Sequence, residues 1–347
     1  MESNILQALP NIHGILIGIG TAFFSGFAMF AYQKLQESKD RLDKVLADVE
    51  FFSTPSNFIG GGNTSLVTDK GELDWDGEAK ILIHHAKSVF SYLDYEEKYG
   101  IPRSEFSYTP SDEDILSTAK DLCLMFHYLF VSYPFSGKSM VHIQGVTDKV
   151  ESRKEEPFSS ERLKDIERRI SFLSWCWETS NRPLIALGQK ATEIERKKAE
   201  AEAIKSFHES MASMGDIPEV EKQRIWKTFH QPRLNMQVDY SKIIHDYFNK
   251  VLIYRERVLP QLSDTLKTYE IFNERFKIKA ITVNALKVMA FIFIFGVLAP
   301  MLVSGLKQDI GLEWHALLPY FLLLTTVVPY VYIWTILFSK VKKLNYS

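Results

Sequence analysis

Residues 12–32 read IHGILIGIGTAFFSGFAMFAY, and none of these 21 positions is Asp, Glu, Lys or Arg. A helix of this length, rising about 1.5 Å per residue, crosses a hydrocarbon core of about 30 Å. A cleaved secretory signal is the alternative reading, but the preceding MESNILQALPN carries no basic residue and no small-residue cleavage site follows. The stretch therefore predicts a first transmembrane helix over residues 12–32.

Two further apolar stretches lie near the C-terminus. Residues 281–303 are apolar except for a few positions that include Asn284 and Lys287, and the lysine is able to snorkel toward the nearer membrane interface. Residues 314–338 contain no Asp, Glu, Lys or Arg, and lipid-embedded helices tolerate prolines such as Pro319 and Pro329. The sequence thus predicts three transmembrane helices that lie in a lipid bilayer.

Basic residues beside these stretches indicate the orientation, because positive charge is retained on the cytoplasmic side. They follow residues 12–32, precede 281–303 and follow 314–338, whereas none precedes 12–32. We therefore expect a multi-pass protein of the inner or plasma membrane, with its N-terminus outside and its C-terminus in the cytoplasm. The basic residues are Lys34, Lys39, Arg41 and Lys44, then Arg275, Lys277 and Lys279, then Lys340, Lys342 and Lys343.

Small residues recur every four positions in the first span, at Gly14, Gly18, Ala22 and Gly26. This spacing places them along one ridge of a helix, where another backbone is able to approach closely. The motif favours close helix packing but does not indicate which helix packs there. It is compatible with packing against the other two spans and with self-association of copies through the first span.

Residues 33–279 predict a large, helical, cytoplasmic domain, so the fold class is all-α. Apolar residues recur there at helical spacing, and EIERKKAEAE at 193–202 resembles an exposed helix or short coiled coil. Local end signals predict a helix over 78–99 ended by Gly100, one that begins at Ser111 with Asp114 as its capping-box partner, one over about 160–178, and a further one with Pro183 in its first turn. A flexible loop is expected near 53–65, which contains three consecutive glycines, and an irregular segment over 134–158. The absence of a turn signal between Ser263 and Ile281 predicts that the last cytoplasmic helix runs unbroken into the second span.

Overall composition excludes several classes of function. The 347 residues carry a net charge of −2, which argues against nucleic acid as a partner, because phosphate backbones require a concentrated positive field. The two cysteines, Cys123 and Cys176, have apolar and aromatic neighbours, so we expect buried packing. The histidines lack the spacing of metal-ligand pairs, and no catalytic constellation or cofactor is indicated.

One string, SYPFSGKS at 132–139, partly resembles a phosphate-binding loop. Gly137, Lys138 and Ser139 match the end of G-x-x-x-x-G-K-[ST], but Ser132 replaces the first glycine and no alternating α/β pattern surrounds the string. An ordinary turn is the expected structure, and nucleotide or cofactor binding at these three residues is the alternative.

These observations leave three hypotheses for function. The first is a membrane-anchored helical binding or signalling module, whose cytoplasmic domain recognises an unidentified protein or ligand. The second is a homo-oligomeric pore or membrane-perturbing effector gated by that domain. The third is a membrane-tethered nucleotide-dependent enzyme that uses Lys138.

Overall fold

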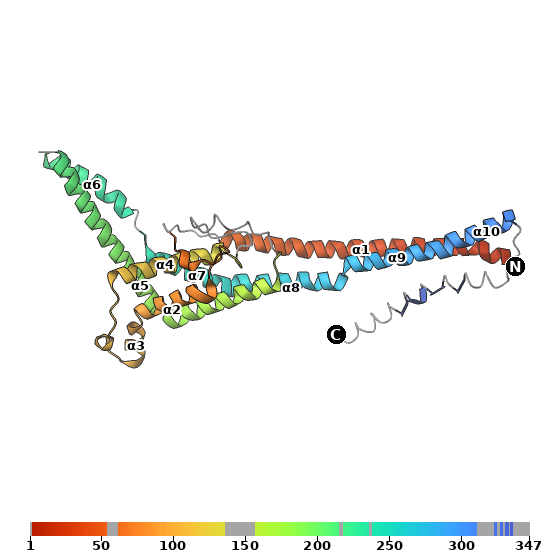
Figure 1. Cartoon of the computed structure of the whole chain (residues 1–347), viewed down its shortest axis with the longest axis horizontal. Helices are drawn as coiled ribbons and strands as arrows, with labels where there is room; N and C mark the ends of the chain where they lie inside the picture. Colours follow the sequence, from red (N-terminus) through yellow and green to blue (C-terminus); the bar gives the residue numbers. More distant parts are fainter. Residues whose placement is uncertain are drawn as a thin grey trace. The chain divides into compact units, whose positions relative to one another are not determined.

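The computed structural model describes residues 2–53, 62–135, 157–214, 218–235 and 238–310, with short helical pieces at 323–324, 327–328, 330–332 and 334–335 (Figure 1). Within these ranges all regular secondary structure is helical, and Val67 and Leu73 form an isolated bridge. The all-α fold class is confirmed for the described part of the chain. Most of the two expected irregular segments and of residues 314–338 lies outside it.

The helical elements follow one another along the chain as α1 (Glu2–Ser53), η1 (Thr64–Leu66), η2 (Trp75–Ala79), α2 (Lys80–Val89), α3 (Tyr92–Tyr99), η3 (Arg103–Glu105), α4 (Asp112–Val131), α5 (Ser160–Met214), α6 (Glu219–Asn235), α7 (Tyr240–Ile253), η5 (Tyr254–Val258), α8 (Leu259–Phe276), α9 (Ile278–Ile292), η6 (Phe293–Leu298) and α10 (Ala299–Ile310). They form two compact units. The terminal unit comprises Met1–Arg41 with Lys267–Ser347, and the central unit comprises Leu42–Leu266.

The terminal unit pairs the first part of α1 with α9, η6 and α10 (Figure 1). Phe276 packs edge-on against Phe27, with 6.3 Å between ring centroids, and Thr21 Oγ1 donates a hydrogen bond of 3.4 Å to Met289 Sδ. These pairs run in opposite directions along the two segments, so the first part of α1 is antiparallel to α9.

Apolar side chains of the terminal unit are left on its surface. Phe23 is 81% exposed and Leu302 is 65% exposed. Within the described ranges, two helical stretches are long and apolar enough to cross a membrane, Ala8–Ser53 and Tyr240–Gly305. Only 6% and 17% of their most apolar windows are buried. The core helix of a water-soluble domain would bury such residues.

The central unit has a conventional packed core. Helix α4 is buried on most sides, and Phe126 lies against Tyr247 and Phe248 of α7 with ring centroids 5.2 and 4.9 Å apart. Gly188 of α5 allows α7 to approach closely, because a Cβ at this position would lie 2.7 Å from Ser241 Cα. Beyond a kink at Ser180, the later half of α5 pairs with α6 (Figure 1).

Local signals set several helix ends. Ser111 and Asp114 form a capping box at the start of α4, and Gly100 ends α3 in the left-handed conformation with φ 65°. The expectation of an unbroken helix into residues 281–303 is wrong at one residue. Lys277 adopts φ 38° and ψ 45° between α8 and α9, a left-handed conformation that no local sequence signal for a turn announces.

Candidate functional site

The residues singled out from the sequence have different positions in the structure. Gly137, Lys138 and Ser139 lie outside the described residues, so nucleotide binding there stays a prediction. Asn284 and Lys287 have exposed side chains on α9. All four small residues of the ridge on α1 are exposed, and a Cβ added at Gly14, Gly18 or Gly26 would meet no atom within 4 Å. Within the described part of the chain, the ridge is therefore not the surface through which α1 packs on α9.

His13 of α1 provides a polar contact that the sequence analysis did not identify. Its Nδ1 lies 3.1 Å from the Tyr330 hydroxyl, and the two rings stack with centroids 5.9 Å apart. Gly296 of η6 makes room for the imidazole, because a Cβ there would lie 2.7 Å from His13 Cγ. Residues from all three predicted spans thus meet at one buried histidine. The spacing in the sequence gave no signal for this pairing, which depends on the tertiary fold.

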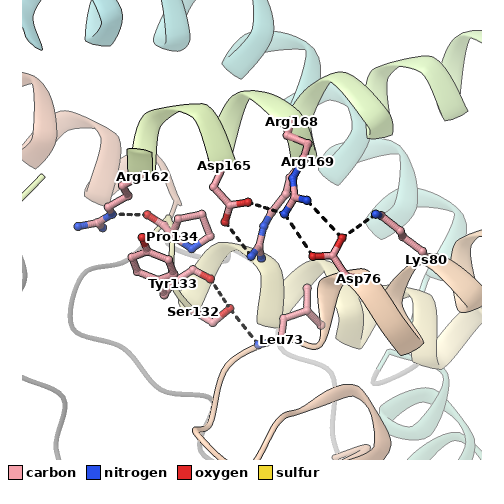
Figure 2. Close-up of polar contacts among 10 residues, drawn as sticks. All are labelled: Leu73, Asp76, Lys80, Ser132, Tyr133, Pro134, Arg162, Asp165, Arg168 and Arg169. Atoms are coloured by element: carbon pink, nitrogen blue, oxygen red, sulfur yellow. Dashed lines mark hydrogen bonds and ion pairs between the residues drawn. The ribbon is translucent and has the colours of Figure 1, made fainter. Parts of the chain in front are cut away.

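A charged network on the first half of α5 is the most developed polar cluster in the described residues of the central unit (Figure 2). Arg168 lies between two carboxylates: its Nη2 is 2.7 Å from Asp165 Oδ1 and 3.3 Å from Asp76 Oδ2. Asp76, which belongs to η2, also accepts a hydrogen bond of 2.7 Å from Lys80 Nζ. Asp165 Oδ2 in turn accepts one of 2.9 Å from Arg169 Nη2. The network therefore joins α5 to η2 and α2.

In this network each carboxylate interacts with two cationic side chains, which affects the pKa of several of these groups. The Lys80 hydrogen bond, reinforced by Arg168, lowers the pKa of Asp76 below its usual range. The hydrogen bond to Asp165 raises the pKa of Arg168, whereas burial lowers that of Arg169. Asp76 therefore stays ionised at neutral pH, shared between Lys80 and Arg168.

Arg169 and Arg162 anchor this region to the protein interior. Arg169 is 7% exposed, and its guanidinium carbon lies 5.5 Å from the centre of the Trp75 ring. Arg162, also 7% exposed, donates through Nε to the Pro134 carbonyl oxygen at 2.6 Å (Figure 2). This hydrogen bond fixes the segment that follows α4 beside the first turn of α5.

A depression of about 370 Å³ lies beside the network. We call it the Arg168 depression; its lining residues are Tyr133, Glu161, Lys164, Asp165 and Arg168. Four of these lie at spacings of three, four and seven along α5, so they share one face of the helix. The fifth, Tyr133, follows α4. The arrangement presents a lysine and a held arginine to solvent in a concave, polar surface.

Part of this site was visible in the sequence, because acidic and basic residues at helical spacing follow the predicted start of a helix near Ser160. The contribution of Asp76 was not, since it is 92 residues from Arg168 along the chain. Among the described residues no group of three or more His, Cys, Asp or Glu side chains could hold a metal ion. No protein-family model matches the chain, and comparisons with curated proteins and with solved structures gave no significant match.

Proposed function

We propose that the chain is a multi-pass protein of the inner or plasma membrane, in which the central unit acts as a cytoplasmic binding or signalling module. The observation that carries this proposal is the contrast between the two units. The apolar side chains of α1, α9 and α10 are exposed, whereas those of the central unit form a buried core. Exposed apolar helices of this length match the surface that a bilayer covers.

The proposed topology adds residues 314–338 as a third span. Basic residues flank the cytoplasmic end of each span in this arrangement, so the N-terminus is outside and the C-terminus inside. The contact between His13 and Tyr330 supports the third span, because it brings a residue of 314–338 onto α1. The Arg168 depression then lies in a domain on the cytoplasmic side, as recognition of a cytoplasmic ligand requires.

Charged substitutions on the exposed face of α1 test the anchoring. Ile19 and Phe23 are 63% and 81% exposed, so Ile19→Lys/Phe23→Lys disturbs no packed core. In a membrane each lysine at the helix centre costs about 3 kcal/mol, and we expect the variant to be lost from alkali-washed membranes. Ala201→Lys, on an exposed charged part of α5, is the matched control and should stay in the membrane fraction.

A variant that leaves the membrane as a folded, soluble monomer would also be informative, because it would separate anchoring from folding of the central unit. Wild-type protein extracted by alkali would contradict the proposal, since helices that span a bilayer resist that wash. Equal retention of the lysine variant and the Ala201→Lys control would contradict the role of α1.

A homo-oligomeric pore or membrane-perturbing effector is a second candidate, favoured by the open ridge at Gly14, Gly18, Ala22 and Gly26. Because added Cβ atoms at the three glycines meet no described atom within 4 Å, the described part of the chain leaves the ridge open to the same ridge of a second copy. We expect liposomes holding the full chain to leak ions and Gly14→Leu/Gly18→Leu to abolish the leak. Tight wild-type vesicles, with and without cytoplasmic extract, would leave the anchored module as the working function.

A further inference from the structure

The cations around the Arg168 depression exceed the carboxylates that hold them. Lys80, Arg168 and Arg169 share only Asp76 and Asp165. Lys164 adds an ammonium with no ion-pair partner among the described residues, and Glu161 adds a carboxylate. The lining itself is balanced, with Lys164 and Arg168 against Glu161 and Asp165. One net positive charge comes from the residues behind it, where Lys80 and Arg169 face only Asp76 in addition.

Stability alone does not account for this arrangement. The side chains of Arg168 and Asp76 are 54% and 62% exposed, and ion pairs at such exposed positions contribute little to stability. These ion pairs instead fix the orientation of the Arg168 side chain. Two carboxylates fix the planar guanidinium of Arg168, while its Nε–H has no acceptor among the described residues and is left to donate elsewhere.

The size and donor set of the depression indicate its ligand. A guanidinium that presents N–H donors in one plane, beside a lysine ammonium, suits the oxygens of a phosphate group. The first turn of α5 adds the positive end of a long helix. A volume of about 370 Å³ holds a phosphate together with a small group that carries it.

We propose that the Arg168 depression binds a phosphate monoester, with Arg168 and Lys164 as its ligands and Asp76 and Asp165 as positioning residues for Arg168. The inference rests on the proposed function, since it names the ligand class of the cytoplasmic module. A free phosphate ester and the headgroup of a monoester lipid such as phosphatidic acid share this chemistry.

The test uses the full-length chain in phosphatidylcholine nanodiscs, titrated with glycerol 3-phosphate by calorimetry. Arg168→Gln and Lys164→Gln should each weaken binding by about tenfold or more, because a charge-assisted contact is lost. Glu161→Gln should strengthen binding, since it removes a negative charge from the lining. Lys197→Gln removes a cation from the same helix at an exposed pair with Glu193, and should bind as wild type does.

A second arm distinguishes the two sources of the phosphate. If the headgroup is the ligand, separate vesicles containing phosphatidic acid should capture the nanodiscs in an Arg168-dependent way, whereas vesicles of phosphatidylglycerol, a phosphate diester, should not. Binding of glycerol 3-phosphate without vesicle capture would assign a free ester. Either result supports the monoester site.

Three results would overturn the proposal: no binding in either arm, equal binding by wild type and Arg168→Gln, or sulfate binding as tightly as the ester. If Arg168→Gln lost binding and also melted at a lower temperature, Lys164→Gln would decide the outcome, because that substitution breaks no ion pair among the described residues. Failure here is distinct from failure of the anchoring proposal, because retention in alkali-washed membranes is measured separately.

Discussion

The thiols of Cys123 and Cys176 have no exposed surface, as their apolar neighbours in the sequence predicted. Burial raises the pKa of Cys176 to about 11, with Lys87 acting weakly in the opposite direction, and it raises the pKa of Cys123 further. We therefore predict that a maleimide reagent leaves both thiols unmodified in the native protein at neutral pH and modifies both after unfolding. Rapid labelling of the native chain would contradict the buried placement.

The same pKa shifts predict how stability depends on pH. A thiol whose pKa is raised in the folded state contributes stability that is complete below its ordinary pKa, near 9, and is lost as pH rises through about 11. Burial also raises the pKa of Tyr240 to about 12, which extends the loss upward. Melting temperatures measured from pH 8 to pH 11 should fall, and the fall should be shallower in Cys123→Ala/Cys176→Ala. Identical slopes in the two proteins would contradict this assignment.

Sequence analysis correctly predicted the roles of residues whose environment depends mainly on their neighbours in the chain. The capping pair Ser111 and Asp114 is one example, and Gly100 at the end of α3 is another. His13 is a counterexample, because its partners Gly296 and Tyr330 are about three hundred positions away and nothing in the local sequence marks them.

At the scale of elements, the packing of α7 on α5 depends on one missing side chain. A Cβ at Gly188 would lie 2.7 Å from Ser241 Cα, and backbone is unable to yield as a flexible side chain does. Gly188→Ala should therefore destabilise the central unit by about 1–3 kcal/mol, seen as a lower urea midpoint. Gln189→Ala, at the adjacent exposed position, should change stability by less than about 0.5 kcal/mol. Equal effects of the two substitutions would mean that the two helices are not in close contact.

At the break between α8 and α9 we expect a substitution to increase stability rather than decrease it. Lys277 has φ 38°, which costs a residue with a side chain about 1–2 kcal/mol and costs glycine almost nothing. Lys277→Gly should therefore raise the thermal stability of the detergent-solubilised chain. In an unbroken helix the same change would lower stability by about 1 kcal/mol, so a decrease would favour the continuous helix expected from the sequence.

Most helices could be predicted from apolar spacing and end signals, and so could one of the breaks between them. Pro183 indicated the first turn of a new helix, and α5 does divide into two helices at Ser180, which has φ −146° and ψ 30°. By contrast, residues Glu78 to Tyr99 read as one helix, yet the structure has α2 and α3 separated at Phe90 and Ser91. No glycine or proline marks that second break in the sequence.

At the scale of the whole molecule, apolar surface separates the two units more clearly than any motif does. The central unit buries its apolar residues, and the terminal unit exposes them along α1, α9 and α10. Composition predicted this division, because the apolar residues are concentrated at the two ends of the chain. The candidate site could be predicted only in part: α5 supplies Lys164, Asp165 and Arg168 at helical spacing, but folding is needed to bring Asp76 to Arg168.

The central claim, that the chain spans a membrane with its central unit in the cytoplasm, is tested most directly by site-specific cysteine labelling. Ser3→Cys, Glu113→Cys and Ser347→Cys are made singly, and the buried native thiols supply a low background. In intact cells a membrane-impermeant maleimide should label only Ser3→Cys, with the other two labelled after permeabilisation. Labelling of Glu113→Cys in intact cells would contradict the cytoplasmic placement of the central unit, and external labelling of Ser347→Cys would contradict a third span.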